Sequence, residues 1–219
     1  MCTSKKSMLK NYLIITLTFF FLSNCQQEKP LFEPISAADS GIDFINQITE
    51  NDTLNPLRFE YIYNGAGVGV ADFNNDGLTD VYFAGNQVSG ELYLNRGDFQ
   101  FENITKIANT QTKLWCTGVA IVDINQDGWQ DIYLSTINTI KGKSSPNLLF
   151  INQKANKDGI PIFKEMAAEV GLADSSYATQ GAFLDYDRDG DLDMFQLTNA
   201  LESFSRNNLN NFAKHHFLA

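Results

Sequence analysis

The chain has 219 residues, of which 43% are apolar, so it can build the core of one domain or of two small ones. Its 26 acidic residues outnumber the 16 basic residues, and the formal net charge of −10 argues against nucleic acid as a partner because the phosphates would be repelled. The 3 cysteines are too dispersed for a disulfide framework, and Cys116, in front of an apolar run, is expected to be a buried structural thiol.

The first residues have the pattern of an export signal. Lysines precede a short apolar run at residues 12–22, which is too short for a membrane-spanning helix, and the chain becomes polar directly after Cys25. Residues 22–25 (LSNC) resemble a bacterial lipoprotein box, although Asn24 stands where a smaller residue is usual. We therefore expect residues 1–25 to be a lipoprotein signal peptide and lipobox, with the lipid on Cys25. The mature protein would then be exported and anchored by its lipid to the bacterial outer membrane or cell surface.

Residues 26–63 are expected to form an N-terminal linker and a first outer strand. The strand is inferred from an aromatic residue that is followed, three positions later, by a β-branched or sulfur-containing residue. The same spacing occurs twice more in the chain; the pairs are Phe32 with Ile35, Phe101 with Ile104, and Phe163 with Met166.

An internal repeat occupies residues 64–219. Three acidic loops share the pattern Asp-x-[Asp/Asn]-x-Asp-Gly-x-x-Asp, and their first aspartates are 51 and 62 residues apart. This interval is about the length of one four-stranded blade of a β-propeller. A further apolar strand at residues 92–95 is echoed at 148–152, which predicts units of four strands with an acidic loop after the first strand. The loops are residues 72–80, 123–131 and 185–193.

The spacing within each loop suits a hard cation. Oxygen atoms at alternate positions converge when a loop curls around one point, and the glycine at position six permits the sharp turn. Position seven would supply its backbone carbonyl, and position nine would supply a closing carboxylate. An EF-hand begins in the same way but needs a glutamate at position twelve and flanking helices, which are missing here. The predicted ligands are Asp72, Asn74, Asp76, Leu78 and Asp80; Asp123, Asn125, Asp127, Trp129 and Asp131; and Asp185, Asp187, Asp189, Asp191 and Asp193.

Calcium is the predicted ion, because magnesium retains its waters and demands a stricter octahedron. The third loop has four carboxylates at the side-chain ligand positions, against three in each of the other loops, so we expect it to bind most tightly. Without metal the carboxylates would repel one another and leave the loops loose. The alternative is that the Asp/Asn-Gly segments are hairpin turns that bind nothing, but three copies at the spacing of a blade favour metal sites.

The repeat resembles a known family. Residues 64–72 (NGAGVGVAD) and 92–97 (LYLNRG), together with the acidic loops, resemble the FG-GAP/VCBS repeats of integrin-α-type β-propellers and of VCBS-repeat lipoproteins of Bacteroidota. The resemblance implies an all-β fold with about three four-stranded blades and with calcium at the loop residues named above. Closed propellers have four to eight blades, so three units predict a partial β-propeller with an incomplete ring, like the N-terminal part of a larger protein.

The sequence favours a binding module over an enzyme. It contains no Gly-x-Ser-x-Gly, His-Glu-x-x-His or phosphate-loop motif, and its adjacent His215 and His216 would point to opposite faces of a strand. We expect a calcium-binding, cell-surface propeller that binds an extracellular glycan or protein. The alternatives are the N-terminal part of a carbohydrate-active enzyme of the polysaccharide lyase type, and a structural spacer that binds nothing. The candidate ligand contacts are Tyr63, Trp115, Trp129 and Tyr177.

Overall fold

The computed structural model describes residues 30–139 and 145–199, and the backbone of residues 216–218. Residues 30–35 belong to one compact unit and contain no helix or strand, while the remaining described residues belong to a second unit. The predicted leader at residues 1–25, with its lipid site Cys25, lies outside the described residues, as do His215 and the side chain of His216. No helix within the described ranges is both long and apolar enough to cross a membrane.

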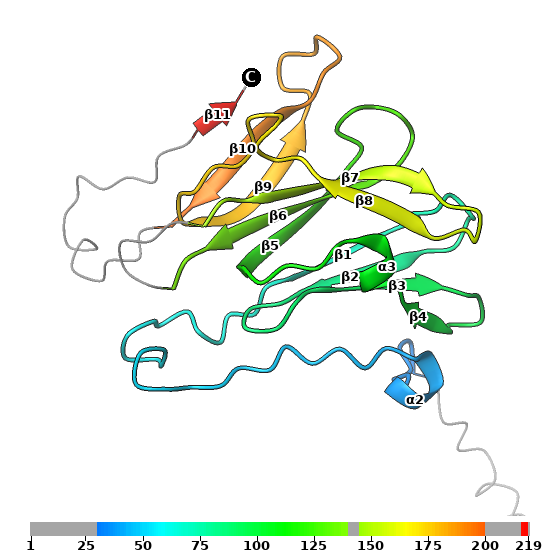
Figure 1. The fold of residues 1–219 in the computed structure, drawn as a ribbon, viewed down its shortest axis with the longest axis horizontal. Coiled ribbons are helices and arrows are strands. Elements are labelled where there is room, and N and C mark those ends of the chain that lie inside the picture. Colours follow the sequence, from blue (N-terminus) through cyan, green and yellow to red (C-terminus); the bar gives the residue numbers. More distant parts are fainter. Residues whose placement is uncertain (1–29, 140–144, 200–215, 219) are drawn as a thin grey trace, which may run out of the picture. The chain divides into compact units, whose positions relative to one another are not determined.

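The second unit contains three antiparallel sheets, which confirms the prediction of an all-β fold, and the sheet of β5 to β8 lies between the other two (Figure 1). The first sheet has the strand order β1-β2-β3-β4, and the second has the order β5-β6-β7-β8. Each strand therefore pairs with the next strand along the chain. The bounds are β1 Gly67–Ala71, β2 Asp80–Ala84, β3 Glu91–Asn95, β4 Phe101–Asn103, β5 Trp115–Val122, β6 Asp131–Ile137, β7 Leu148–Ala155 and β8 Pro161–Glu165.

The third sheet has the order β11-β10-β9, with β9 at Ala178–Leu184, β10 at Asp193–Thr198 and β11 at His216–Leu218. β9 and β10 pair on either side of the third acidic loop, and β11 pairs with β10 so that Met194 lies opposite Leu218. The third sheet therefore has three strands in the described part of the chain, in agreement with the sequence, in which no aromatic outer-strand motif clearly follows Asp193.

The two short helices lie outside the sheets. α2 (Ala37–Ser40) begins at Ser36, whose hydroxyl accepts a hydrogen bond from the backbone N–H of Asp39 at 3.1 Å, and α3 (Thr105–Ala108) follows β4. No strand occurs in residues 30–66, where the first outer strand was expected. That segment instead contributes Phe59 and Ile62 to an apolar cluster with Trp115 and Ile137.

The sheets approach each other most closely through their first strands, because β1 packs against β5 and β5 packs against β9. Gly67 and Gly69 of β1 face Val119 and Ile121 of β5. A Cβ atom added to Gly69 would lie 2.5 Å from the Ile121 Cδ1 atom, which is too short for any real contact. The alternating glycines of this strand are therefore required by the close approach of the two sheets.

Two apolar cores fill the spaces between the sheets. The first lies between the first and second sheets and includes Tyr82 and Ile132, while the second includes Tyr133 and Met194 of the second and third sheets. Neighbouring residues of β6 thus point into different cores, and all seven residues of this strand are buried. The central sheet is covered on both faces, and this accounts for the burial of every residue of β6.

Cys116 is fully buried in the first core and has no disulfide partner, which confirms the predicted structural thiol. Burial raises the pKa of this thiol to about 12. Because the thiolate is the reactive form, we expect iodoacetamide to leave Cys116 unmodified in the folded protein from about pH 7 to pH 9. Peptide mass spectrometry with and without denaturant would check this, and rapid native-state alkylation at this position would contradict it.

Candidate functional site

The three acidic loops occupy equivalent places in the fold, because each connects the first two strands of its sheet. The first loop joins β1 to β2, the second joins β5 to β6, and the third joins β9 to β10. Positions four and six of every loop have positive φ. These are Asn75, Gln126 and Arg188 at position four, with φ of 58°, 55° and 65°, and Gly77, Gly128 and Gly190 at position six, with φ of 88°, 84° and 99°. The shared sequence pattern therefore produces the same backbone turn three times.

In the first two loops, the aspartate at position one organises the turn. Asp72 accepts hydrogen bonds from the backbone N–H groups of Asp76 and Gly77 at 3.1 and 2.7 Å. Asp123 does the same with Asp127 and Gly128 at 2.9 and 2.8 Å. The carboxylate therefore lies on the concave side of the loop, toward which the oxygen ligands of a cation would converge.

Position seven also behaves alike in all three loops. The backbone N–H groups of Leu78, Trp129 and Asp191 donate to the position-five carboxylates at 2.8, 3.0 and 3.1 Å. The backbone N–H of position seven is thus used within the loop, and its carbonyl as a cation ligand stays a prediction. Position three differs more, because the Asn74 side chain donates at 2.9 Å to Asp76 and at 3.0 Å to the Gly159 carbonyl, outside the loop.

The aspartate at position nine fastens its loop to the sheet. Asp80 and Asp131 are fully buried, and each accepts two backbone hydrogen bonds. One comes from position two of the same loop, at 2.9 Å from Phe73 and 3.0 Å from Ile124. The other comes from the third strand of the sheet, at 2.8 Å from Asn95 and 2.7 Å from Asn152.

Burial raises the pKa of both Asp80 and Asp131 to about 6, against the opposing effect of these hydrogen bonds and with a smaller contribution from the neighbouring loop carboxylates. Each ionised carboxylate is therefore shielded from water and lies near the other aspartates of its loop. A divalent cation in the loop would offset this unfavourable charge.

The third loop brings three carboxylates together. Single oxygen atoms of Asp185, Asp187 and Asp193 all lie within 4.8 Å of one another. No other group of three potential His, Cys, Asp or Glu ligands meets this condition in the described ranges. Asp193 accepts the hydrogen bond from position two, Tyr186, at 2.9 Å, as its counterparts do, but it is only half-buried. This loop has the donor set of a calcium site: hard, anionic oxygens without nitrogen or sulfur.

Asp189 and Asp191 of the third loop interact with each other. The pKa of Asp189 is lowered by the hydrogen bonds that it accepts from Asp191, and the pKa of Asp191 is raised by the hydrogen bond and the charge of Asp189. Repulsion alone would raise the pKa of both carboxyl groups, so the hydrogen bonds from Asp191 outweigh it at Asp189.

Two residues with a structural role at the loops, Asn95 and Asn152, were not predicted from the sequence. Besides the backbone hydrogen bond to position nine, the Asn152 side chain donates to the Phe73 carbonyl of the first loop at 2.8 Å and to the Gln130 carbonyl at 3.2 Å. The Asn95 side chain donates to the Thr79 carbonyl at 2.9 Å. Their role could have been suspected from the sequence, because the similar apolar segments at residues 92–95 and 148–152 both end in asparagine.

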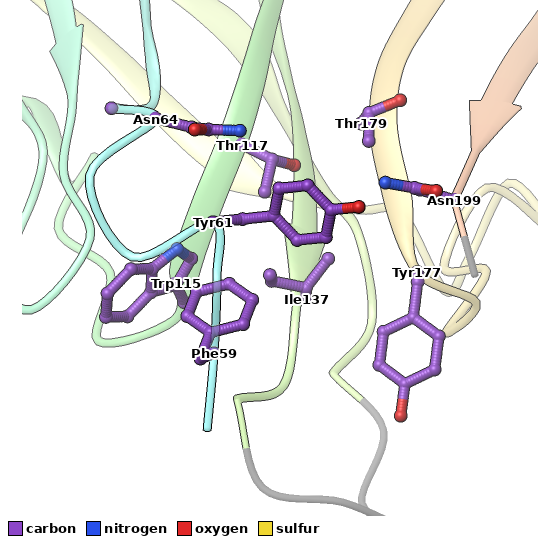
Figure 2. Close-up of a pocket in the computed structure, with 10 residues that line it drawn as sticks. Phe59, Tyr61, Asn64, Trp115, Thr117, Ile137, Tyr177, Thr179 and Asn199 are labelled. Atoms are coloured by element: carbon purple, nitrogen blue, oxygen red, sulfur yellow. The ribbon is translucent and has the colours of Figure 1, made fainter. Parts of the chain in front are cut away.

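Figure 2 shows an aromatic pocket of about 260 Å³. It lies at the opposite end of the strands from the acidic loops, because β5 begins at Trp115 in the pocket and ends just before the second loop, while β6 begins at the last residue of that loop and ends at Ile137 in the pocket. Trp115 packs edge-on against Phe59, with ring centroids 5.5 Å apart. The lining residues are Phe59, Tyr61, Asn64, Gly65, Trp115, Thr117, Ile137, Tyr177, Thr179 and Asn199.

The four aromatic residues predicted to contact a ligand separate in the structure. Trp115 and Tyr177 line the pocket (Figure 2), whereas Trp129 lies in the second acidic loop and Tyr63 is outside the pocket with its hydroxyl donating to Glu50. Asn64 and Asn199 bring side-chain amides to the pocket wall. The pocket therefore combines ring faces with amide and hydroxyl groups, as many small-molecule sites do.

Comparison with known proteins finds a match to a family of repeats over part of the chain. Residues 59–134, which include the first sheet and the first strand of the second, match the model of the FG-GAP-like repeat family. Cartilage acidic protein 1 of Homo sapiens is 27% identical over 131 residues, and that of Mus musculus is 28% identical over 134 residues. Each alignment covers 60% of this chain and 20% of the relative, so the chain spans about a fifth of the length of the relatives it matches. The three antiparallel sheets are thus consistent with β-propeller-like repeats of the FG-GAP type.

Proposed function

We propose that this chain is a calcium-binding, β-propeller-type module that is displayed on the cell surface by a lipid on Cys25 and binds an extracellular glycan or protein. The observation that carries the proposal is the convergence of Asp185, Asp187 and Asp193 in a loop whose backbone form recurs twice more in the chain. The lipid anchor rests on the pattern of residues 22–25.

The loop residues fit calcium chemically. Asp185, Asp187 and Asp193 would hold the ion in the third loop, and the aspartates and asparagines at positions one, three, five and nine would do so in the others. Both oxygen atoms of Asp80 accept a backbone hydrogen bond, but each retains a second lone pair for a cation. Bound calcium would neutralise part of the charge of −10 and hold each loop in one conformation.

The aromatic pocket supports the ligand-binding part of the proposal. The half-buried rings of Tyr61 and Tyr177 offer apolar surface for a sugar ring or an apolar side chain, and the amides of Asn64 and Asn199 offer donors and acceptors for hydroxyl groups. Because the pocket and the acidic loops lie at opposite ends of the strands, a ligand and calcium would bind without competing for the same residues.

Replacing Tyr177 by alanine is expected to weaken ligand binding by about tenfold or more, because a truncated aromatic anchor typically costs over 1–2 kcal/mol. The measurement is calorimetric titration of a panel of polysaccharides, with Tyr186→Ala as the matched control, since Tyr186 is 69% exposed and outside the pocket. Saturable binding that Tyr177→Ala weakens supports the proposal. Product formation would favour the carbohydrate-active enzyme, and equal binding by both variants would remove the pocket from the proposal.

A further inference from the structure

Hydrogen bonds join neighbouring acidic loops to one another. The Asn75 side chain of the first loop donates to the Gly128 carbonyl of the second loop at 3.2 Å. The Gln126 side chain of the second loop donates to the Gly190 carbonyl of the third loop at 2.7 Å. Both donors stand at position four of their loops and both acceptors at position six, so the same bond is made twice. Each loop is therefore tied to the next one along the chain.

A second, buried connection joins the first loop to the second. The backbone N–H of Asn152, which is 2% exposed, donates to Asp131, at position nine of the second loop, at 2.7 Å. The Asn152 side chain donates to the carbonyl of Phe73, at position two of the first loop, at 2.8 Å. The Phe73 N–H in turn donates at 2.9 Å to Asp80, at position nine of the first loop. The two buried position-nine carboxylates are thus connected through Asn152 and the backbone of Phe73.

These connections use loop residues that lie between predicted calcium ligands. Apart from Asp131, the loop residues that bond to another loop or to Asn152 occupy positions two, four and six, whereas the predicted ligands occupy the odd positions. Phe73, for example, stands between Asp72 and Asn74. An ion that holds the ligands on both sides of such a residue also fixes its backbone, and with it the hydrogen bond to the next loop.

The charges of the loops favour coupling in the positive sense. Each loop has at least three carboxylates at its side-chain ligand positions, so a loop that holds one divalent ion remains negatively charged. A bound ion therefore does not make the neighbouring loop repulsive for a second cation. Ordering of one loop also reduces the conformational entropy that the next loop loses on binding, which raises the affinity of that loop.

We propose that the three loops bind calcium cooperatively, because each occupied loop raises the calcium affinity of its neighbour through these hydrogen bonds. The inference rests on the proposed calcium binding and adds a coupling between the sites. Coupling between two sites typically changes an affinity by a factor of about 5 to 150. The described residues provide two connections between the first and second loops, one of them buried, and one between the second and third. The coupling is therefore strongest between the first two loops.

Calcium titration of the chain, isotope-labelled at glycine and followed by NMR, tests this coupling. Gly77, Gly128 and Gly190 stand at position six of their loops, so their amide signals report on each loop separately. Replacing Asp185 and Asp187, which are both exposed, by alanine disables the third loop. We expect the calcium concentration at the midpoint of the Gly128 signal to rise by about fivefold in this variant, because the second loop loses an occupied neighbour.

Gln126→Gly removes the connection between the second and third loops without straining the turn, because glycine readily adopts the φ of 55° at this position. In this background, disabling the third loop should change the Gly128 midpoint by less than about twofold. Asp98→Gly is the matched control, since Asp98 is exposed, has a φ of 50° and lies in the turn between β3 and β4. It should keep the fivefold difference.

The possible outcomes separate the coupling from calcium binding itself. Equal Gly128 midpoints with the third loop intact and disabled would overturn the coupling and leave calcium binding in place. A difference that survives Gln126→Gly at full size would overturn the proposal as well, because the hydrogen bond would not carry it. If none of the three position-six glycines responds to calcium, the proposed function fails and the coupling fails with it. Melting temperatures in EDTA establish that each variant is folded.

Discussion

Replacing Asp131 by alanine is expected to destabilise the fold by about 2–4 kcal/mol, one of the largest single-residue effects in this chain. The Asp131 carboxylate accepts hydrogen bonds from the backbone N–H groups of Ile124 and Asn152, and the second of these is buried. Alanine would leave both donors without a partner, and water cannot easily reach them because Asp131 itself is fully buried. The measurement is urea unfolding in the presence of EDTA, so that loss of a cation does not contribute.

Asp127→Ala is the matched control for this variant. Asp127 lies in the same loop, is exposed, and accepts one exposed hydrogen bond from Trp129. Its removal should cost no more than about 1 kcal/mol under the same conditions. If the two variants unfolded at the same urea concentration, position nine would not hold the loop to the third strand.

Adding calcium to the EDTA-treated protein is expected to stabilise it by about 1.4–2.7 kcal/mol per site at 10 mM calcium, for dissociation constants of about 10⁻⁴–10⁻³ M. The gain arises because the loops bind the ion only when folded, so binding draws the equilibrium toward the native state. Calorimetry should detect the third loop first, where Asp185, Asp187 and Asp193 converge. Melting temperature with and without calcium gives the second measurement.

Asp187→Asn should weaken the third site to about the affinity of the other two loops, which have asparagine at this position, and it should leave the fold intact because Asp187 is exposed and lies on the loop surface. Asp158→Asn, at an exposed aspartate in the turn between β7 and β8, is the control and should leave calcium binding unchanged. Titration that released no heat, together with a melting temperature that EDTA did not alter, would rule out calcium as the ion of these loops.

Most strands of the sheets and the backbone form of the acidic loops could be predicted from the sequence, because these depend on neighbouring residues, but the outer strand expected before residue 64 does not occur in residues 30–63. The pattern Asp-x-[Asp/Asn]-x-Asp-Gly fixes the turn locally, and the echoed apolar runs correspond to β3 and β7. The role of Asn152 could not be predicted in the same way. Its backbone N–H reaches Asp131 only when β7 pairs with β6, and its side chain reaches Phe73 only when the first and second sheets pack together.

The residues of the aromatic pocket could also be predicted only in part from the sequence. Trp115 and Tyr177 were predicted as contacts because they are aromatic, but so were Tyr63 and Trp129, which the fold places elsewhere. Whether an aromatic residue lines the pocket depends on its place along the folded strands. The residue type alone does not indicate this place. Phe59 and Tyr61 were missed because the segment before β1 was expected to contain a linker and an outer strand, whereas it packs against Trp115.

The close approach of β1 to β5 also determines how neighbouring sheets splay apart. At the first strands, the glycines of β1 leave room only for the side chains of Val119 and Ile121, while elsewhere in the core between the two sheets the larger rings of Tyr82, Phe73 and Phe163 fill the space. The two sheets are therefore not parallel. The angle between them is set by the difference in size between the small residues at their first strands and the large residues farther away. A methyl group on Gly69 would push β1 and β5 apart where they approach most closely, and it would change the angle between the first and second sheets.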